Sequence, residues 1–380
     1  MLSDEARERY SRHLLLPEIG VAGQEKIGAA RVLVIGAGGL GAPASLYLAA
    51  AGIGTLGLID HDHIDRSNLQ RQVLFDTAAI GLGKADTART RLLALNPGIS
   101  VEAHSVELRA ANALELIGPY DLVIDGSDRL ATRYLVNDVC VLLRKPLVSA
   151  AIHRFEGQAM SYLPGRGPCY RCLFPKSEDG VVPNCAEAGV LGVLPGILGA
   201  LQAAEALKII VGIGTPLLGR LLTFDALAMS WHEFSFARRA DCAVCGDHPS
   251  IKSPEDSVAA GLDNSSSAIG RLAPAQLQTF LQRAAIDGAA VTLVDVREPH
   301  EYAASHLQGA INVPLAQLPR RLADLPLHCN TVFICRSGGR SWAAAQLAAS
   351  AGRGSLAHLE GGMLAWAAEL DPAMVVAPLA

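Results

Sequence analysis

The residue with the clearest potential for chemistry is a cysteine in the last third of the chain, Cys335. It follows the apolar run 331–334 and opens the sequence Cys-Arg-Ser-Gly-Gly-Arg-Ser, which leads into helical sequence. Backbone N–H groups of such a strand–loop–helix turn point at the sulfur, and Arg336 and Arg340 add positive charge. The pattern indicates a thiol that can carry a thiolate or a persulfide. The other residues of this loop are Ser337, Gly338 and Gly339.

Four more cysteines form two Cys-x-x-Cys pairs, Cys169 with Cys172 and Cys242 with Cys245. Glycine or proline flanks each pair, which is typical of a turn. Two such turns aim four thiolates at one tetrahedral ion and leave no ligand position open, so we expect a structural Zn²⁺ site. The spacing also allows a redox dithiol, or buried cysteines without a function.

The remaining cysteines are isolated in the sequence. Cys185 lies in a polar segment just before an apolar helical stretch, where a helix N-terminus would lower its pKa. It is therefore either a nucleophile or an ordinary loop cysteine. Cys140 lies in an apolar helical stretch and is predicted to be a core residue, and Cys329 is interpreted as a loop cysteine without a role.

A glycine pattern near the N-terminus, Gly36-x-Gly38-x-x-Gly41, follows the apolar run 31–35 and precedes an alanine-rich helical sequence. Glycines let the backbone approach a phosphate, and the helix N-terminus supplies free N–H groups. Asp60 ends the next apolar run and can accept hydrogen bonds from a ribose. Alone, this pattern fits an NAD enzyme equally well, or a tight turn with no ligand.

Charged residues after this pattern favour ATP. Arg71 and Lys84 are cations near Asp60 in sequence, and Asp128 follows another apolar run. A triphosphate needs cations to neutralise the leaving pyrophosphate, whereas a nicotinamide cofactor does not. Asp128 is a candidate for holding Mg²⁺ or polar parts of the nucleotide.

Apolar runs alternate with helical sequence and predict an α/β protein. The expected strands of the first domain are 31–35, 55–59, 122–124 and 146–149. This alternation predicts a doubly wound, mostly parallel sheet with its loops gathered at the carboxyl ends of the strands. A polar segment then separates a smaller α/β domain, with strands at 291–294 and 331–334 and helices at about 274–285 and 341–351. The predicted domains are 1–248 and 270–380, joined by a linker at 249–269.

Composition narrows the class of protein. Of 380 residues, 50% are hydrophobic and 18% are charged, with a net charge of −5. That charge gives no electrostatic basis for binding nucleic acid or an anionic membrane. The N-terminus is charged and shows no apolar signal segment, so we expect a cytoplasmic protein. The apolar stretch 190–214 is interrupted by Pro195, Gln202, Glu205 and Lys208, which favours a buried helix over a membrane span.

The first domain resembles the adenylyltransferases of molybdopterin and thiamine biosynthesis, in the ubiquitin-activating superfamily. The resemblance rests on Gly-x-Gly-Gly-Leu-Gly at 36–41, Ser-Asn-Leu-Gln-Arg-Gln at 67–72 and Arg-Tyr-Ser-Arg-His at 9–13. It implies a Rossmann-like fold, use of ATP with Mg²⁺, and a homodimer in which Arg12 reaches the neighbouring subunit's ATP. We assign to the nucleotide site Arg12, Gly36, Gly38, Gly39, Gly41, Asp60, Asp62, Ser67, Asn68, Arg71, Lys84, Asp128 and Arg129.

Three further expectations come from this resemblance. The family usually has asparagine where this chain has Arg129, so the contact made by that asparagine is in question here. The family supports the same four cysteine ligands for zinc, although some members lack them. The position of Cys185 matches a superfamily cysteine that can form a covalent link to the carrier protein.

The second domain resembles the rhodaneses. Besides the loop at Cys335, the resemblance rests on segments 295–302, 306–314 and 360–366. Related phosphatases have one more residue between the cysteine and the arginine. Here four residues separate Cys335 from Arg340, so the loop suits a sulfur atom better than a phosphate.

Together the two resemblances imply an adenylyltransferase and sulfurtransferase. It would adenylate the C-terminal glycine of a ubiquitin-like sulfur carrier ending in Gly-Gly and then convert it to a thiocarboxylate, for molybdopterin, thiamine or tRNA thiolation. The implied sulfur donor is a cysteine desulfurase or thiosulfate. The catalytic residues would be Cys335, Cys185, Arg71, Lys84 and Asp128. The alternatives are an NAD-dependent oxidoreductase with a sulfur-binding domain and a non-catalytic zinc scaffold for sulfur-transfer partners.

Overall fold

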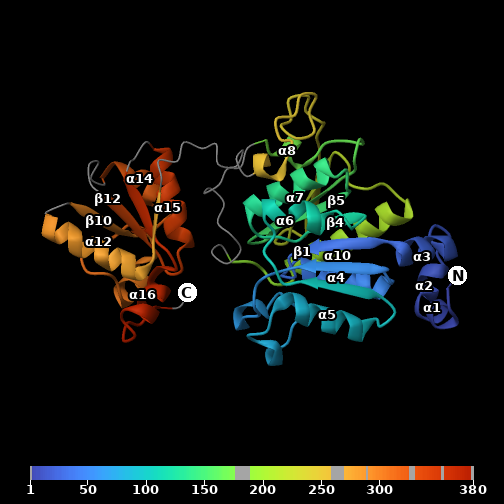
Figure 1. Cartoon of the computed structure of the whole chain (residues 1–380), viewed down its shortest axis with the longest axis horizontal. Coiled ribbons are helices and arrows are strands. Elements are labelled where there is room, and N and C mark those ends of the chain that lie inside the picture. The colour runs from blue at the N-terminus through green and yellow to red at the C-terminus, as the bar shows by residue number, and fades with distance from the viewer. Residues whose placement is uncertain are drawn as a thin grey trace. The chain divides into compact units, whose positions relative to one another are not determined.

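The computed structural model describes residues 2–175, 189–257, 269–287, 290–324, 330–351 and 355–377. These residues form two compact units, each with its own β-sheet (Figure 1). Cys185 and Cys329 lie outside the described residues, so the predictions for them stay predictions. The exact limits predicted for the two domains and the linker also stay predictions.

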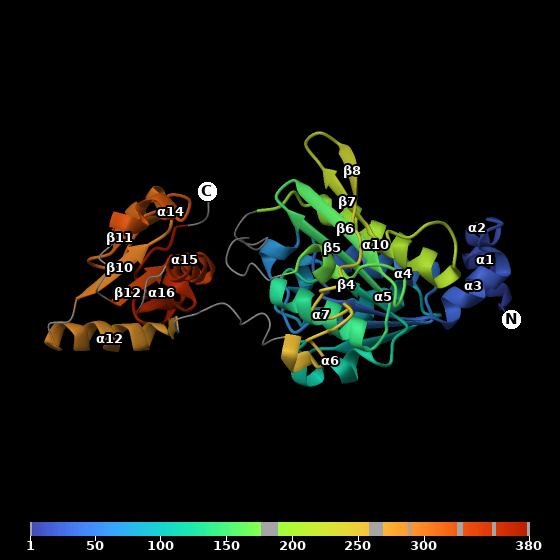
Figure 2. The ribbon, with the colours of Figure 1, turned by 90° about the horizontal axis from the view of Figure 1, so that it is seen from above.

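An eight-stranded sheet in the order β3-β2-β1-β4-β5-β6-β7-β8 forms the centre of the first unit. Its strands are β1 (Arg31–Ile35), β2 (Thr55–Ile59), β3 (Ser100–His104), β4 (Leu122–Asp125), β5 (Leu147–His153), β6 (Glu156–Tyr162), β7 (Arg220–Asp225) and β8 (Ser230–Ser235). Pairing is parallel from β3 to β5 and antiparallel from β5 to β8 (Figure 2). The half of the sheet that carries the glycine pattern is therefore parallel, and the sheet as a whole is mostly parallel, as predicted.

Helices cover both faces of this sheet. They are α4 (Gly41–Ala51), α5 (Lys84–Leu95), α6 (Ala110–Ile117), α7 (Leu130–Leu142), α8 (Tyr170–Leu173) and α10 (Leu194–Val211). Figure 1 shows α4 and α5 on one face and α6 and α7 on the other. Successive side chains of a strand point to opposite faces, so Val32 packs into the core beneath α4 while Leu33 packs into the core beneath α7. Cys140 belongs to the second of these cores and is fully buried, as predicted.

One described helix, α10, is long and apolar enough to cross a membrane by length and composition, and half of that stretch is buried inside the structure. Two of its polar side chains form hydrogen bonds with strands of the sheet. Gln202 donates a hydrogen bond to the carbonyl of Asp125 at 2.7 Å, and Glu205 accepts one from Ser161 at 2.9 Å. The helix lies against α4 and the sheet, as expected for the interrupted apolar stretch.

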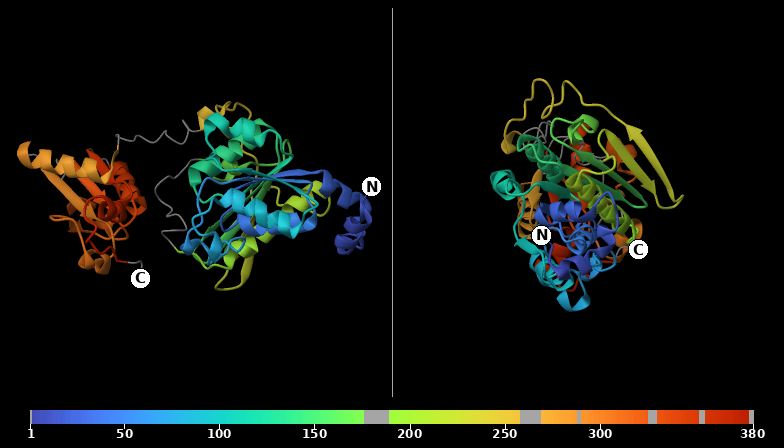
Figure 3. Two further views of the ribbon diagram at one scale, coloured as in Figure 1. Left: turned by 60° about the horizontal axis from the view of Figure 1, so that its bottom comes forward. Right: turned by 90° about the vertical axis from the view of Figure 1, so that its right-hand side faces the viewer.

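Three short helices gather at one end of the first unit, at the N-terminus (Figure 3, dark blue). They are α1 (Asp4–Arg9), α2 (Ser11–Leu14) and α3 (Gly20–Ala29). The Tyr10 ring lies against Gly52, the residue that caps α4. The contact is so close that a Cβ atom on Gly52 would lie 2.3 Å from that ring. This contact fixes the three helices at the C-terminal end of α4.

The second unit is a parallel five-stranded sheet in the order β11-β10-β12-β13-β9. Its strands are β9 (Gly270–Leu272), β10 (Val291–Asp295), β11 (Ile311–Asn312), β12 (Asn330–Ile334) and β13 (Leu356–Leu359). Its helices are α12 (Pro274–Asp287), α13 (Pro299–Ala304), α14 (Leu318–Arg321), α15 (Gly339–Ser350) and α16 (Gly362–Glu369). Alternate residues of β12 again divide between two cores, with Phe333 on the side of α15 and Val332 on the side of α16. This is the smaller α/β domain that the sequence predicts.

Candidate nucleotide and sulfur sites

The glycine pattern forms a tight turn between β1 and α4. Gly36 has a φ of 86°, and a Cβ placed on Gly41 would lie 1.8 Å from the carbonyl oxygen of Gly36. A Cβ on Gly36 would meet the carbonyl of Gly126, in the loop after β4, at 3.0 Å. The loops after β1 and β4 therefore touch at the point where the strand order reverses, which is where open α/β sheets bind their ligands.

Asp60 holds this turn from the end of β2. Its Oδ2 accepts the N–H of Ala37 at 2.8 Å, and its Oδ1 accepts the N–H of Asp62 at 2.9 Å. Burial raises the pKa of Asp60 in spite of the nearby charge of Lys84. A ribose bound here would therefore share a carboxylate that also supports the glycine turn.

Lys84 and Arg71 border the same turn. Lys84 begins α5, is buried, and places its Nζ 3.0 Å from the Oδ2 of Asp62. Burial acts to raise the pKa of Asp62, but the hydrogen bond and charge of Lys84 outweigh it and lower that pKa. Arg71 donates from Nη1 to the carbonyl of Ser67 at 3.0 Å, and its Cδ lies 3.7 Å from the Cβ position of Gly39. Two cations thus converge on the loop that would hold phosphate.

The other predicted residues occupy the rim of this turn. Asn68 accepts the backbone N–H of Asp65 at 3.2 Å and so closes a short 3₁₀ helix. Asp128 is exposed and forms no hydrogen bond or ion pair with any described residue. Arg129 pairs with Glu107 at 3.2 Å. A free carboxylate on this rim is available to a cation or a ligand.

Arg12 is not brought to the turn within one chain. It lies on α2, next to His13. The His13 ring contacts Gln24 at 2.9 Å, and Gln24 in turn donates to the carbonyl of Ala51 at 2.8 Å. These contacts tie α2 to the C-terminal end of α4, whereas the glycine turn precedes its N-terminal end, about 16 Å away for an 11-residue helix. Arg12 is exposed and has no hydrogen-bond or ion-pair partner among the described residues.

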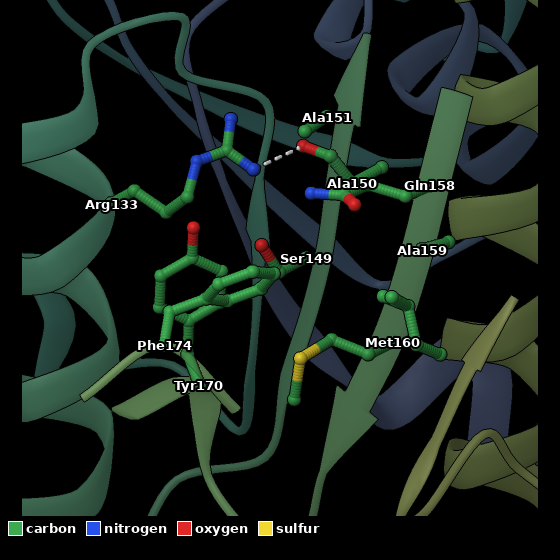
Figure 4. A pocket seen from close by; sticks show the side chains of 10 residues that line it. Arg133, Ser149, Ala150, Ala151, Gln158, Ala159, Met160, Tyr170 and Phe174 are labelled. Carbon is green, nitrogen blue, oxygen red and sulfur yellow. Dashed lines mark hydrogen bonds between the residues drawn. The ribbon is translucent and has the colours of Figure 1, made fainter. Parts of the chain in front are cut away.

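A small recess, with room for about one water molecule, lies between β5, β6, β7, α7 and α8 (Figure 4). Arg133 forms part of its wall and donates to the carbonyls of Ala150 at 2.7 Å and of Ser127 at 2.8 Å. The second contact braces the loop that carries Asp128. The recess is lined by Arg133, Ser149, Ala150, Ala151, Gln158, Ala159, Met160, Tyr170, Phe174 and Leu221.

The four paired cysteines meet in one place. Cys169 lies 3.7 Å from Cys242 and Cys172 lies 3.3 Å from Cys245, measured between Sγ atoms, and all four sulfurs are within 4.8 Å of one another. Sulfurs bound to one tetrahedral Zn²⁺ are about 3.8 Å apart, given a Zn–S distance of about 2.3 Å. The donor set and its spacing therefore fit a closed zinc site that joins α8 to the segment after β8.

Cys335 lies at the end of β12 with its side chain fully buried. The N–H of Gly338 donates to its Sγ at 3.1 Å, and the Oγ of Ser341 lies 3.4 Å from the same sulfur. Gly338 has a φ of 98°. The start of α16 holds the loop from behind, because Met363 donates its N–H to the carbonyl of Cys335 at 2.8 Å. The Gly338 N–H therefore donates to the Cys335 sulfur, while the Cys335 thiol donates to the Ser341 oxygen.

The two loop arginines are engaged away from the sulfur. Arg340 forms a two-pronged ion pair with Glu301 of α13 at 2.7 and 2.8 Å. Burial acts to raise the pKa of Glu301, but the hydrogen bond of Arg340 outweighs it and lowers that pKa. Arg336 donates from Nε to the carbonyl of Ala377 at 3.1 Å. The charge of Arg340 is therefore balanced before any sulfur anion forms, whereas Arg336 contacts only a neutral carbonyl among the described residues and keeps its charge.

Sequence reasoning did not single out Ser341 or Arg133. Ser341 directly follows the loop in sequence. A hydroxyl residue in the first turn of the helix after the loop, α15, is the feature that could have identified it. Arg133 gave no such signal, because an arginine inside a helical stretch is ordinarily a surface residue. Here it is buried, and its contacts with Ser127, Ala150 and Asp125 account for that burial.

Comparison with known proteins fits both sites. Residues 10–244 match the ThiF family model and residues 276–369 match the rhodanese-like domain model. The chain is 43% identical to the probable adenylyltransferase/sulfurtransferase MoeZ of Mycobacterium tuberculosis, over 99% of this chain and 96% of that protein. It is 53% identical to the sulfur carrier protein adenylyltransferase of Thermus thermophilus, over 64% of this chain and 93% of that protein.

The fold has a solved counterpart. The crystal structure of Escherichia coli MccB with ATP matches with a TM-score of 0.55 and 27% identity, covering 62% of this chain and 74% of that one. The full-length match to a two-activity enzyme decides against the oxidoreductase and the scaffold as alternatives. The chain belongs to the ThiF family and is an adenylyltransferase and sulfurtransferase whose ThiF domain is followed by a rhodanese-like domain.

Proposed function

We propose that this enzyme adenylates the C-terminal glycine of a ubiquitin-like sulfur carrier ending in Gly-Gly and then converts it to a thiocarboxylate with sulfur from Cys335. One observation carries the proposal. The same chain holds a glycine turn bordered by Lys84 and Arg71 and a loop in which a backbone N–H donates to one cysteine sulfur. The first arrangement suits phosphate and the second suits a sulfur anion.

In the first step, a carboxylate oxygen of the carrier attacks the α-phosphorus of ATP, and pyrophosphate leaves. The backbone N–H groups of the turn and the cations Lys84 and Arg71 stabilise the negative charge that moves onto the leaving phosphates. Asp128 would hold Mg²⁺, which supplies further neutralisation of phosphate charge when bound. The product is a carrier acyl-adenylate.

In the second step, Cys335 carries sulfur as a persulfide, taken from a cysteine desulfurase or from thiosulfate. Its terminal sulfur attacks the acyl carbon of the adenylate, and AMP leaves with the bonding electrons. The resulting acyl disulfide is cleaved when a thiolate, from Cys185 or from another thiol, attacks the Cys335 sulfur. The carrier thiocarboxylate departs, and a disulfide to Cys335 remains to be reduced.

Several further assignments belong to the same proposal. The four cysteines hold a structural Zn²⁺, supported by their spacing. A homodimer would let Arg12 serve the neighbouring subunit's ATP, supported by its exposure and its distance from the turn in its own chain. The carrier serves molybdopterin, thiamine or thiolated-tRNA synthesis. The enzyme works in the cytoplasm without nucleic acid or membrane, which its modest net charge supports.

The experiment that tests this proposal is ATP–pyrophosphate exchange with the full-length protein and candidate carriers ending in Gly-Gly. Wild-type protein should catalyse exchange only with a suitable carrier, and Asp128→Ala should abolish most of it. An Asp121→Ala variant, which removes a carboxylate before β4, should exchange like the wild type. Exchange without any carrier, or full exchange by Asp128→Ala, would contradict the proposal.

A further inference from the structure

A polar chain of three side chains runs from the reactive sulfur into the core of the second unit. The Oγ of Ser341 lies 3.4 Å from the Sγ of Cys335 and 3.3 Å from the Nδ1 of His358. Ser341 comes from α15 and His358 from β13, so two elements supply it. Ser341 is fully buried and His358 is 5% exposed, which means that water does not compete for these contacts.

The Ser341 hydroxyl has one hydrogen and a choice of acceptors. At present it donates to the carbonyl of Gly338 at 2.9 Å, while the Cys335 thiol donates to the Ser341 oxygen. Once Cys335 has lost its proton, its thiolate is a charged acceptor and competes better for that hydrogen than a neutral carbonyl does. A rotation about the Cβ–Oγ bond of Ser341 is enough to redirect it.

His358 is set up to support this rotation as a neutral ring. Burial, and then the charge of Arg271, lower the pKa of His358, so its ring is uncharged near neutral pH. Its Nε2 has no hydrogen-bond partner among the described residues. A buried N–H without a partner is rarer than a buried acceptor without one, so the hydrogen belongs on Nδ1. From there it faces both the oxygen of Ser341, 3.3 Å away, and the backbone of Gly338.

Other donors near the sulfur are few. Gly338 supplies one N–H, whereas Arg340 is bound to Glu301 and Arg336 to a backbone carbonyl. The charged and titratable groups that surround Cys335 are Arg336 and Arg340 in its loop, Glu301 on α13, Asp295 at the end of β10 with Arg297 after it, and His358 and Glu360 on and after β13. A second donor at the thiolate must therefore come from Ser341.

We propose that Ser341 and His358 form a hydroxyl switch that stabilises the Cys335 thiolate. Ser341 donates to Gly338 while Cys335 is a thiol, and it donates to the sulfur while Cys335 is a thiolate. His358 is a positioning residue that holds the Ser341 oxygen throughout. This inference rests on the proposed use of Cys335 as the sulfur carrier, because Cys335 must be a thiolate each time it attacks a sulfur donor.

The test is the pH dependence of Cys335 alkylation by iodoacetamide in full-length protein, followed by mass spectrometry of the peptide that contains Cys335. Ser341→Ala should raise the apparent pKa of Cys335 by about one unit and slow alkylation near pH 7 about tenfold. His358→Asn keeps an N–H donor at the Nδ1 position and should keep the wild-type profile, whereas His358→Leu should raise the pKa. Ser305→Ala removes a hydroxyl that bonds only Val375 and should change nothing.

The double variant decides whether His358 acts through Ser341. If it does, Ser341→Ala with His358→Leu should alkylate like Ser341→Ala alone, and additive shifts would overturn this part. An unchanged pKa in a folded Ser341→Ala protein, checked by near-ultraviolet circular dichroism, would overturn the switch itself. If Ser341→Ala fails to fold, an unchanged pKa in His358→Leu overturns it instead. Failure of wild-type Cys335 to gain a sulfur atom from thiosulfate or a desulfurase would count against the proposed function, while the alkylation profile would still decide the switch.

Discussion

The nucleotide rim of the first unit takes its residues from separate loops after β1, β2 and β4 and from the start of α5, whereas the sulfur loop of the second unit is one segment between β12 and α15. On the rim, Asp128 is exposed, and the exposed Asp62 is paired with the buried Lys84. In the sulfur loop, Arg340 and Glu301 are already paired, and Cys335 is fully buried.

The difference follows the size and charge of what each site handles. A nucleoside triphosphate carries several charges and is many ångströms long, so its site needs accessible charged groups on several loops. One sulfur atom needs short contacts and little net charge, and a single loop can supply them. A substitution at one site should therefore leave the reaction at the other site unchanged.

The largest effect is expected from Cys335→Ala. Thiocarboxylate formation should fall by at least about a thousandfold, because the atom that carries sulfur is gone. ATP–pyrophosphate exchange with the carrier should stay at the wild-type rate, since the rim is untouched. Mass spectrometry of the carrier and an exchange assay on the same preparation measure both. Thiocarboxylate made at the full wild-type rate would show that Cys335 is dispensable.

Lys84→Ala should have the next largest effect, on the other site. Loss of a preorganised cation at the leaving phosphates should slow carrier-dependent exchange about 100- to 1,000-fold. Transfer of sulfur from thiosulfate to Cys335 should not change. Asp62→Asn is the matched control, because it removes the partner of Lys84 at 3.0 Å and keeps the cation. If both variants lose exchange equally, the ion pair matters and the cation alone does not.

Glu301→Ala tests the internal pairing of the sulfur loop. It leaves Arg340 without its partner, and breaking a buried pair of this kind costs about 3–5 kcal/mol of the free energy of unfolding. Urea unfolding followed by tryptophan fluorescence measures the loss, since Trp342 and Trp366 lie in the second unit and Trp231 lies in the first. Glu301→Gln should lose less. Equal stability of wild type and Glu301→Ala would mean that the pair contributes nothing to folding.

The smallest effect concerns pH. Because the pKa of Glu301 is lowered in the folded protein, the pair stabilises the fold at neutral pH, and this stability is lost as the pH falls through the folded-state pKa. The difference in melting temperature between wild type and Glu301→Gln should therefore shrink between about pH 5 and pH 3. A difference that stays constant over that range would indicate that Glu301 acts by packing and not by charge.

The sequence predicts four of the five strands in the parallel half of the first sheet, missing β3, and none of the strands β6 to β8. The strand β1 is buried on both sides and reads as a continuous apolar run, so it is recognisable from residues 31–35 alone. The edge strand β8 is exposed along most of its length and contains Trp231 beside polar residues, so no apolar pattern marks it. A strand buried on both faces is recognisable in the sequence as an apolar run, whereas an exposed edge strand is not.

The sites divide in the same way. Residues within one short motif, such as Gly36 with Gly41 or Cys335 with Arg340, are predictable because their spacing fixes their geometry. Contacts between separate elements are not, since nothing in the sequence relates Ser341 to His358 or Arg133 to Ala150. Those pairs depend on how strands and helices are packed, and only a structure reveals them.

The four-cysteine cluster has a consequence for the order in which the chain matures during synthesis. Its last member, Cys245, precedes the first strand of the second unit, β9 at Gly270–Leu272. Domains fold as units from the N-terminal side while the ribosome works. The cluster can therefore close around α10, β7 and β8 before any strand of the second unit has been made. A nascent chain would acquire its nucleotide-handling half first and its sulfur-handling half last, so that reactive sulfur is never present without the domain that uses it.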